Sequence, residues 1–143
     1  MPGPSELSSP ALGCLDRQLG EALDLAVACR FLSDRARTDG DGLTAVVLER
    51  LSSDLTDQAA ILAPLARVER PAGGPPLPDG SSSDSGSWLA ELDARLGRAA
   101  LIAQTDAMAP DLEPIIVGLL SALAALYRTR RELLLVSTVL DAA

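Results

Sequence analysis

Apolar residues recur at the three- and four-residue spacing of an α-helix in four segments of this chain. That spacing places them on one face of a helix, so each segment predicts an amphipathic helix. The segments cover residues 9–37, 43–70, 88–108 and 112–140. In the first, the expected buried face consists of leucine, alanine and cysteine: Leu12, Leu15, Leu19, Ala22, Ala26 and Cys29. The pattern therefore indicates an all-α fold.

The composition agrees with closely packed helices. Of the 143 residues, 48 % are hydrophobic but only 2 % are aromatic, namely Phe31, Trp88 and Tyr127. A core must then be built from leucine, alanine, valine and isoleucine, which is typical of helices packed against one another. Because the length suits one domain, we expect residues 1–143 to form a single helical domain.

A proline interrupts the second segment. Its expected buried face consists of aliphatic residues: Leu43, Val47, Leu51, Leu55, Leu62 and Leu65. Pro64 lacks an N–H group and crowds the carbonyl of the preceding turn. We expect either a kink near Ile61 or a helix end at Ala63.

The third and fourth segments carry start signals. Ser87 is the expected N-cap of the third helix, and Pro114 suits the first turn of the fourth. The third helix should bury one apolar stripe: Leu89, Leu92, Leu96, Ala99 and Ala103. Glu91 lies four residues before Arg95, so this pair is expected to support the outer face.

Residues 71–87 separate the two pairs of helices. Their sequence, PAGGPPLPDGSSSDSGS, is too polar and too rich in turn residues to bury anything, so it predicts a mobile linker between a hairpin at 9–70 and a hairpin at 88–141. Fully extended, it could span about 55 Å, more than the length of about 40 Å expected for one helix. A four-helix bundle in up-down-up-down order and one in long-crossover order both remain open.

The fourth segment is apolar on every side from Ile115 to Leu126. Such a helix must be covered on more than one face, either as the central helix of the bundle or as a dimer interface. We expect a homodimer formed by five residues: Ile115, Gly118, Leu119, Ala122 and Leu126. The small residues Gly118 and Ala122, four apart, would let a neighbouring backbone approach closely.

The chain contains no histidine, lysine or asparagine. This absence removes the commonest general base, the commonest metal ligand and the Schiff-base nucleophile. The sequence also lacks the serine-hydrolase elbow, the phosphate-binding loop and the dinucleotide fingerprint. We therefore expect a protein that is not an enzyme and that needs no cofactor.

Two carboxylate pairs are the strongest argument for chemistry. Glu21 with Asp24, and Asp54 with Asp57, have the spacing with which all-helical pyrophosphohydrolases hold magnesium. The helical wheel places the first pair away from the core stripe and the second at its flanks, which favours a solvated surface. A di-iron site of the usual kind is excluded because it requires histidine.

Three arginines near the end of the chain form its one basic cluster: Arg128, Arg130 and Arg131. Guanidinium groups bind phosphates and carboxylates in a bidentate manner, so the cluster is a candidate contact for an anion or an acidic partner. The alternative is a solvated face paired with acids such as Glu132.

The two cysteines have no zinc or redox spacing. On one continuous helix Cys14 and Cys29 lie about 22 Å apart, too far for a disulfide. We expect both to pack in the core, although Arg30 beside Cys29 leaves a redox role open.

The charge balance limits the partners. Twelve arginines face 20 carboxylates, a formal net charge of −8, which disfavours nucleic acid. No secretory signal is visible, and the longest uncharged run, residues 114–127, is shorter than the roughly 20 residues that cross a bilayer. We expect a cytoplasmic protein, and arginine without lysine or asparagine fits a GC-rich bacterial genome.

These features predict a non-catalytic adaptor, chaperone or scaffold that acts through protein–protein contacts, because the fourth helix is too apolar to be covered within so small a chain. One alternative is a bundle that holds a small apolar ligand in its core. A second is a magnesium-dependent phosphohydrolase that uses the two carboxylate pairs.

Overall fold

The computed structural model describes residues 7–66 and 85–142, and these form four α-helices. Helix α1 spans Ser9–Thr38, α2 spans Gly42–Leu62, α3 spans Ser85–Ala107 and α4 spans Pro114–Ala142. Helices α1 and α2 pack as one hairpin, and α3 and α4 pack as the other. The all-α fold of two helical hairpins is confirmed.

Local signals in the sequence form the first hairpin. The Ser8 hydroxyl caps α1 by accepting a hydrogen bond from the Ala11 amide, as an N-cap serine does. At the other end, Gly40 adopts a φ of +82°, and the Asp41 amide donates to the Ala36 carbonyl at 2.9 Å. This is a Schellman ending, which requires a left-handed residue after the helix. The Asp41 side chain then caps α2 at the Thr44 amide.

Pro64 ends α2. The helix stops at Leu62, and Ala63 is its C-cap, so the expected helix end is confirmed and the kink and the continuation to residue 70 are not. Residues 67–70 of that predicted segment lie outside the described residues.

Helix α3 begins earlier than predicted. It starts at Ser85, so Ser87 lies within the first turn and the prediction of Ser87 as the N-cap was wrong. Serine is tolerated in a first turn as well as before it, and this tolerance blurred the boundary. The rest of the predicted linker, residues 71–84, lies outside the described residues. Pro114 lies in the first turn of α4, as expected, although the helix begins at Pro114 and not at Leu112.

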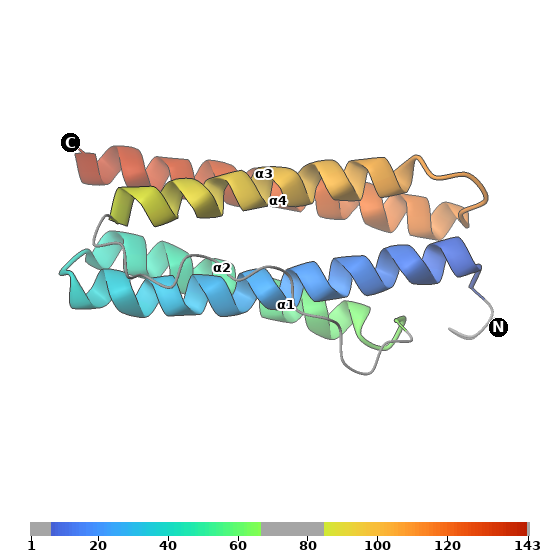
Figure 1. Cartoon of the computed structure of the whole chain (residues 1–143), viewed down its shortest axis with the longest axis horizontal. Helices are drawn as coiled ribbons and strands as arrows, with labels where there is room; N and C mark the ends of the chain where they lie inside the picture. Colours follow the sequence, from blue (N-terminus) through green and yellow to red (C-terminus); the bar gives the residue numbers. More distant parts are fainter. Residues whose placement is uncertain (1–6, 67–84, 143) are drawn as a thin grey trace.

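The helices are arranged in the long-crossover order. In Figure 1, α1 and α4 run in one direction, and α2 and α3 run in the other. Helix α1 contacts α2 and α3, while α4 contacts α3 and α2. Each helix therefore occupies a corner, and α4 is not the central helix that one reading of its apolar sequence predicted.

The core is built from leucine and alanine contributed by all four helices, with Trp88 and Tyr127 as its aromatic members. Every residue of the stripe predicted for α1 is buried. On α2, however, Leu43 is exposed, so its expected burial was wrong. Leu43 is the second residue of α2, at the end of the bundle where the first turn is less covered by other helices.

Candidate functional site

Helix α4 presents two parallel apolar stripes. The inner stripe is buried against α2 and α3 and consists of Ile116, Leu120, Leu123, Tyr127, Arg130, Leu134 and Ser137. A second set, which we call the outer stripe, is shifted by about one residue and consists of Ile115, Leu119, Ala122, Leu126, Thr129, Leu133, Val136 and Leu140. Its members alternate at four- and three-residue intervals, which is the a/d spacing of a coiled coil.

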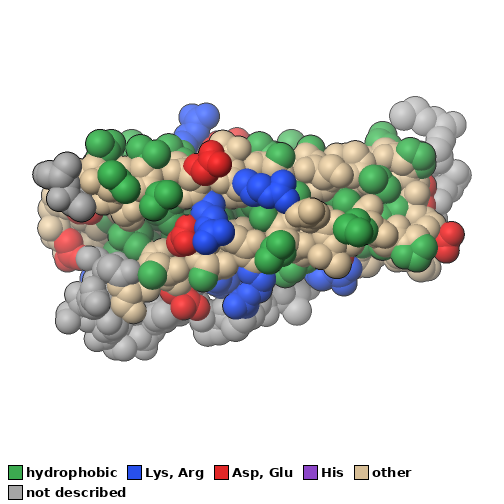
Figure 2. All heavy atoms as spheres, turned by 90° about the horizontal axis from the view of Figure 1, so that it is seen from above, with side chains coloured by type: hydrophobic (Ala, Val, Ile, Leu, Met, Phe, Trp, Pro, Cys, Tyr) green, Lys and Arg blue, Asp and Glu red, His purple; other side chains and the backbone are tan. Residues whose placement is uncertain are grey.

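The outer stripe is open to solvent. All its members are exposed except Leu119, which is half-buried. The most exposed of the large ones, Ile115, has 77 % of its surface accessible to solvent. The stripe contains no charged residue although 22 % of the chain is charged. Viewed from the side of α3 and α4, the bundle shows apolar side chains along much of its length, with basic and acidic ones near the middle and acidic ones also at both ends (Figure 2). An uncharged, exposed stripe of this length indicates a contact surface.

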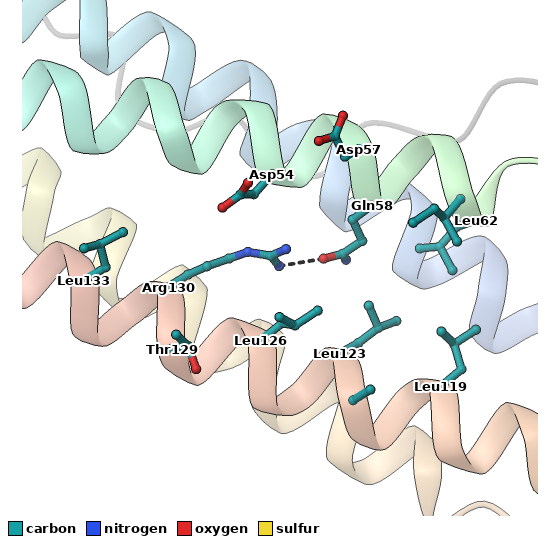
Figure 3. Close-up of a pocket in the computed structure, with 12 residues that line it drawn as sticks. Asp54, Asp57, Gln58, Leu62, Leu119, Leu123, Leu126, Thr129, Arg130 and Leu133 are labelled. Atoms are coloured by element: carbon teal, nitrogen blue, oxygen red, sulfur yellow. Dashed lines mark hydrogen bonds between the residues drawn. The ribbon is translucent and has the colours of Figure 1, made fainter.

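A groove runs between α2 and α4, and the outer stripe forms part of one wall. Its volume is about 410 Å³, within the range of small-molecule sites. Helix α2 contributes Asp54, Asp57, Gln58, Ile61 and Leu62, and α4 contributes Leu119, Ala122, Leu123, Leu126, Thr129, Arg130 and Leu133. Figure 3 shows the leucines following one another along the groove, with Arg130 extended between the two helices.

A buried polar network crosses this groove. Arg130 donates a hydrogen bond to Oε1 of Gln58, and Nε2 of Gln58 donates to the Tyr127 hydroxyl at 3.0 Å. The Arg130 guanidinium also lies 5.3 Å from the centre of the Tyr127 ring, close enough for a cation–π contact. These contacts fix the Gln58 amide with its oxygen towards the cation.

Burial controls the ionisation of this region. Removal of water lowers the pKa of Arg130, and it raises the pKa of Tyr127 and of nearby Cys29 to about 12. In each case the low-dielectric surroundings disfavour the charged form. Tyr127 and Cys29 are therefore neutral at physiological pH, so neither supplies a negative charge to Arg130.

The structure separates the three arginines of the predicted basic cluster. Arg128 is exposed and donates to Gln104 of α3, whereas Arg131 makes a bidentate pair with Asp93 of α3 at 2.9 and 3.1 Å. Only Arg130 enters the groove. Successive helical residues point about 100° apart, so neighbours in sequence face different helices.

The five predicted interface residues lie on or beside the outer stripe. Ile115, Leu119, Ala122 and Leu126 belong to it, and the last three also line the groove. Gly118 is exposed beside the stripe, and a Cβ added there would meet nothing within 4 Å.

One carboxylate of each predicted pair lies against an arginine. Glu21 lies 3.5 Å from Arg95 of α3, and Asp54 lies 3.3 Å from Arg50. The expected pair between Glu91 and Arg95 is replaced by this contact between hairpins, because Arg95 is buried rather than on the outer face. Within residues 7–66 and 85–142 there is no group of three His, Cys, Asp or Glu side chains that could hold a metal ion.

Both cysteines are free and buried, as the packing interpretation expected. Burial also raises the pKa of the Cys14 thiol.

Sequence reasoning missed two contributors to this region. Gln58 carries no motif, and its role depends on α4 lying opposite. Arg17 carries no motif either, and it forms an ion pair with Asp106 of α3 at 3.0 Å that joins the two hairpins.

Comparison with known proteins adds no assignment: no family model matches the chain, and no curated protein or solved structure matches it either. None of the helices in the part of the chain that the structure describes is both long enough and apolar enough to span a membrane.

Proposed function

We propose that this chain is a non-catalytic interaction protein that dimerises through the outer stripe of α4 and serves, as a dimer, as an adaptor, chaperone or scaffold in the cytoplasm. The observation that supports this proposal is the stripe itself. It places exposed apolar residues at coiled-coil spacing from Ile115 to Leu140. In water, such a surface is stabilised by pairing with another helix.

The order of side chains along the stripe favours an antiparallel pairing of two copies. In that arrangement Ala122 of one copy faces Leu133 of the other, and Leu126 faces Thr129. Each small residue is then matched with a larger one, so the layers are of similar volume. A parallel pairing would set Ala122 against its own copy and leave a thin layer there, and unfilled space in an interface is destabilising.

Sedimentation equilibrium over micromolar concentrations tests the dimer with two matched variants. Leu126→Glu places a charge on the outer stripe, and Leu135→Glu places the same charge at another exposed position of α4 outside the stripe. We expect a dimer for the unmodified chain and for Leu135→Glu. We expect a monomer for Leu126→Glu, because burying an unpaired carboxylate in an interface costs roughly several kcal/mol. A monomeric unmodified chain, or a Leu126→Glu variant that still dimerises, would contradict the proposal.

A further inference from the structure

Arg130 places a positive charge in an otherwise largely apolar groove. The residue is only 7 % exposed, and its guanidinium points between α2 and α4 (Figure 3). Among the described residues it forms no ion pair with a carboxylate, and it donates a hydrogen bond to the neutral amide of Gln58. A buried charge without an ion pair is costly.

The groups around Arg130 neutralise it only in part. Asp54 lies in the same groove and its negative charge favours the Arg130 cation, but Oδ1 of Asp54 is bound by Nε of Arg50 and no ion pair joins Asp54 to Arg130. Asp57 also lines the groove, but its carboxylate points away from Arg130 in Figure 3. Cys29 and Tyr127, which also lie near the guanidinium, are kept protonated by burial. A bound carboxylate would form the ion pair that Arg130 lacks and accept two parallel hydrogen bonds from the guanidinium.

The remainder of the groove is suited to a hydrocarbon chain. From Leu133 to Leu119, α4 advances about 21 Å, and the walls beyond Arg130 are formed by Leu126, Leu123, Leu119, Ile61 and Leu62. The groove, with a volume of about 410 Å³, is therefore elongated, apolar over most of its length and open on one side. This shape suits one extended alkyl chain.

We propose that the groove between α2 and α4 binds a single-chain amphiphile with a carboxylate head group, the head at Arg130 and the alkyl chain along the leucines. The site goes beyond the proposed dimer because all its residues belong to one chain. Five residues lie on both the groove wall and the outer stripe, namely Leu119, Ala122, Leu126, Thr129 and Leu133. A second copy would therefore cover the open side of the groove.

Titration calorimetry and native mass spectrometry with hexadecanoate, below the concentration at which it forms micelles, test the site. We expect one hexadecanoate per chain. Hexadecanol, which has the chain without the charge, and butanoate, which has the charge without the chain, should each bind at least about tenfold more weakly, because a charge-assisted hydrogen bond and a buried alkyl chain each contribute more than the energy of a tenfold change.

Two variants with matched controls locate the ligand. Arg130→Met should weaken hexadecanoate binding by about tenfold or more, while Arg128→Met, on the same helix but outside the groove, should leave it unchanged. Ile61→Glu places a negative charge at an exposed position beside the proposed alkyl chain. Val46→Glu places the same charge at an exposed position of the same helix, outside the groove. Ile61→Glu should abolish binding and Val46→Glu should not, whether or not Arg130→Met folds.

Absence of hexadecanoate binding, equal binding of hexadecanol, or equal binding to Arg130→Met that is folded by circular dichroism would overturn the proposal. So would binding of butanoate with the affinity of hexadecanoate, which would indicate a simple anion site. The mass spectra report ligand per chain and chains per assembly separately, so a failed ligand site and a failed dimer are distinguishable.

Discussion

The glycine at the turn of the first hairpin offers a test of the fold in which the same substitution has opposite effects at two positions. Gly40 has a φ of +82°, and Gly13 lies within α1. A Cβ added at either position would meet nothing within 4 Å. Steric contact therefore contributes at neither site, and only the backbone conformation distinguishes them.

The magnitudes follow from the two conformations. A side chain in the left-handed region costs about 1–2 kcal/mol, while replacement of glycine reduces the entropy of the unfolded chain and returns about 0.4–1 kcal/mol. Gly40→Ala should therefore destabilise the protein by about 1 kcal/mol. Gly13→Ala should stabilise it by about 0.5–1 kcal/mol, because alanine is the better helix former.

Thermal unfolding followed by circular dichroism measures both variants. For a chain of this size, 1 kcal/mol corresponds to a shift in Tm of about 3 °C, so the two variants should differ by about 5 °C. Shifts of the same sign and size would refute the reasoning, because they would mean that Gly40 is not held in the left-handed conformation by the Schellman ending of α1.

Two further predictions concern the core. Leu134 is 1 % exposed and its neighbour Leu135 is 59 % exposed, so in urea unfolding Leu134→Ala should cost about 2–5 kcal/mol and Leu135→Ala less than about 0.5 kcal/mol; similar costs would contradict the assigned orientation of α4. Burial raises the pKa of Cys29 and of Tyr127 to about 12. In the unfolded chain both groups ionise at lower pH. Their contribution to the free energy of unfolding is therefore complete below about pH 9 and is lost as the pH rises towards 12. Urea unfolding between those pH values should show this decline, and it should be shallower in Cys29→Ala; an equal slope in that variant would argue against burial of the thiol.

Much of the fold could be predicted from local patterns. The stripe of α1, the turn at Gly40, the end of α2 before Pro64 and the start of α4 at Pro114 all depend on residues within a few positions of one another. Capping, proline geometry and helical periodicity act over that range, so each can be recognised in the sequence. The apolar character of α4 could be recognised in the same way.

Contacts between helices could not be predicted. The spacing in the sequence predicted an ion pair between Arg95 and Glu91, four residues away. In the fold, Arg95 pairs instead with Glu21 of the other hairpin. Gln58 likewise gains its role only because Tyr127 and Arg130 of α4 lie opposite. Local spacing says nothing about which helices become neighbours, because the long connection allowed two helix orders.

The amphipathic pattern and the absence of histidine and lysine are properties of the sequence alone, and they decided that the chain is helical and which catalytic groups it lacks. Tertiary structure decided which part of the apolar surface of α4 is covered. Helix α4 lies at a corner of the bundle, so its inner stripe is buried against α2 and α3 while its outer stripe remains exposed. The same packing separated Arg128, Arg130 and Arg131, which are close in sequence, and brought only Arg130 into the groove. The helix sets the direction of each side chain, whereas the fold decides which residues lie opposite it.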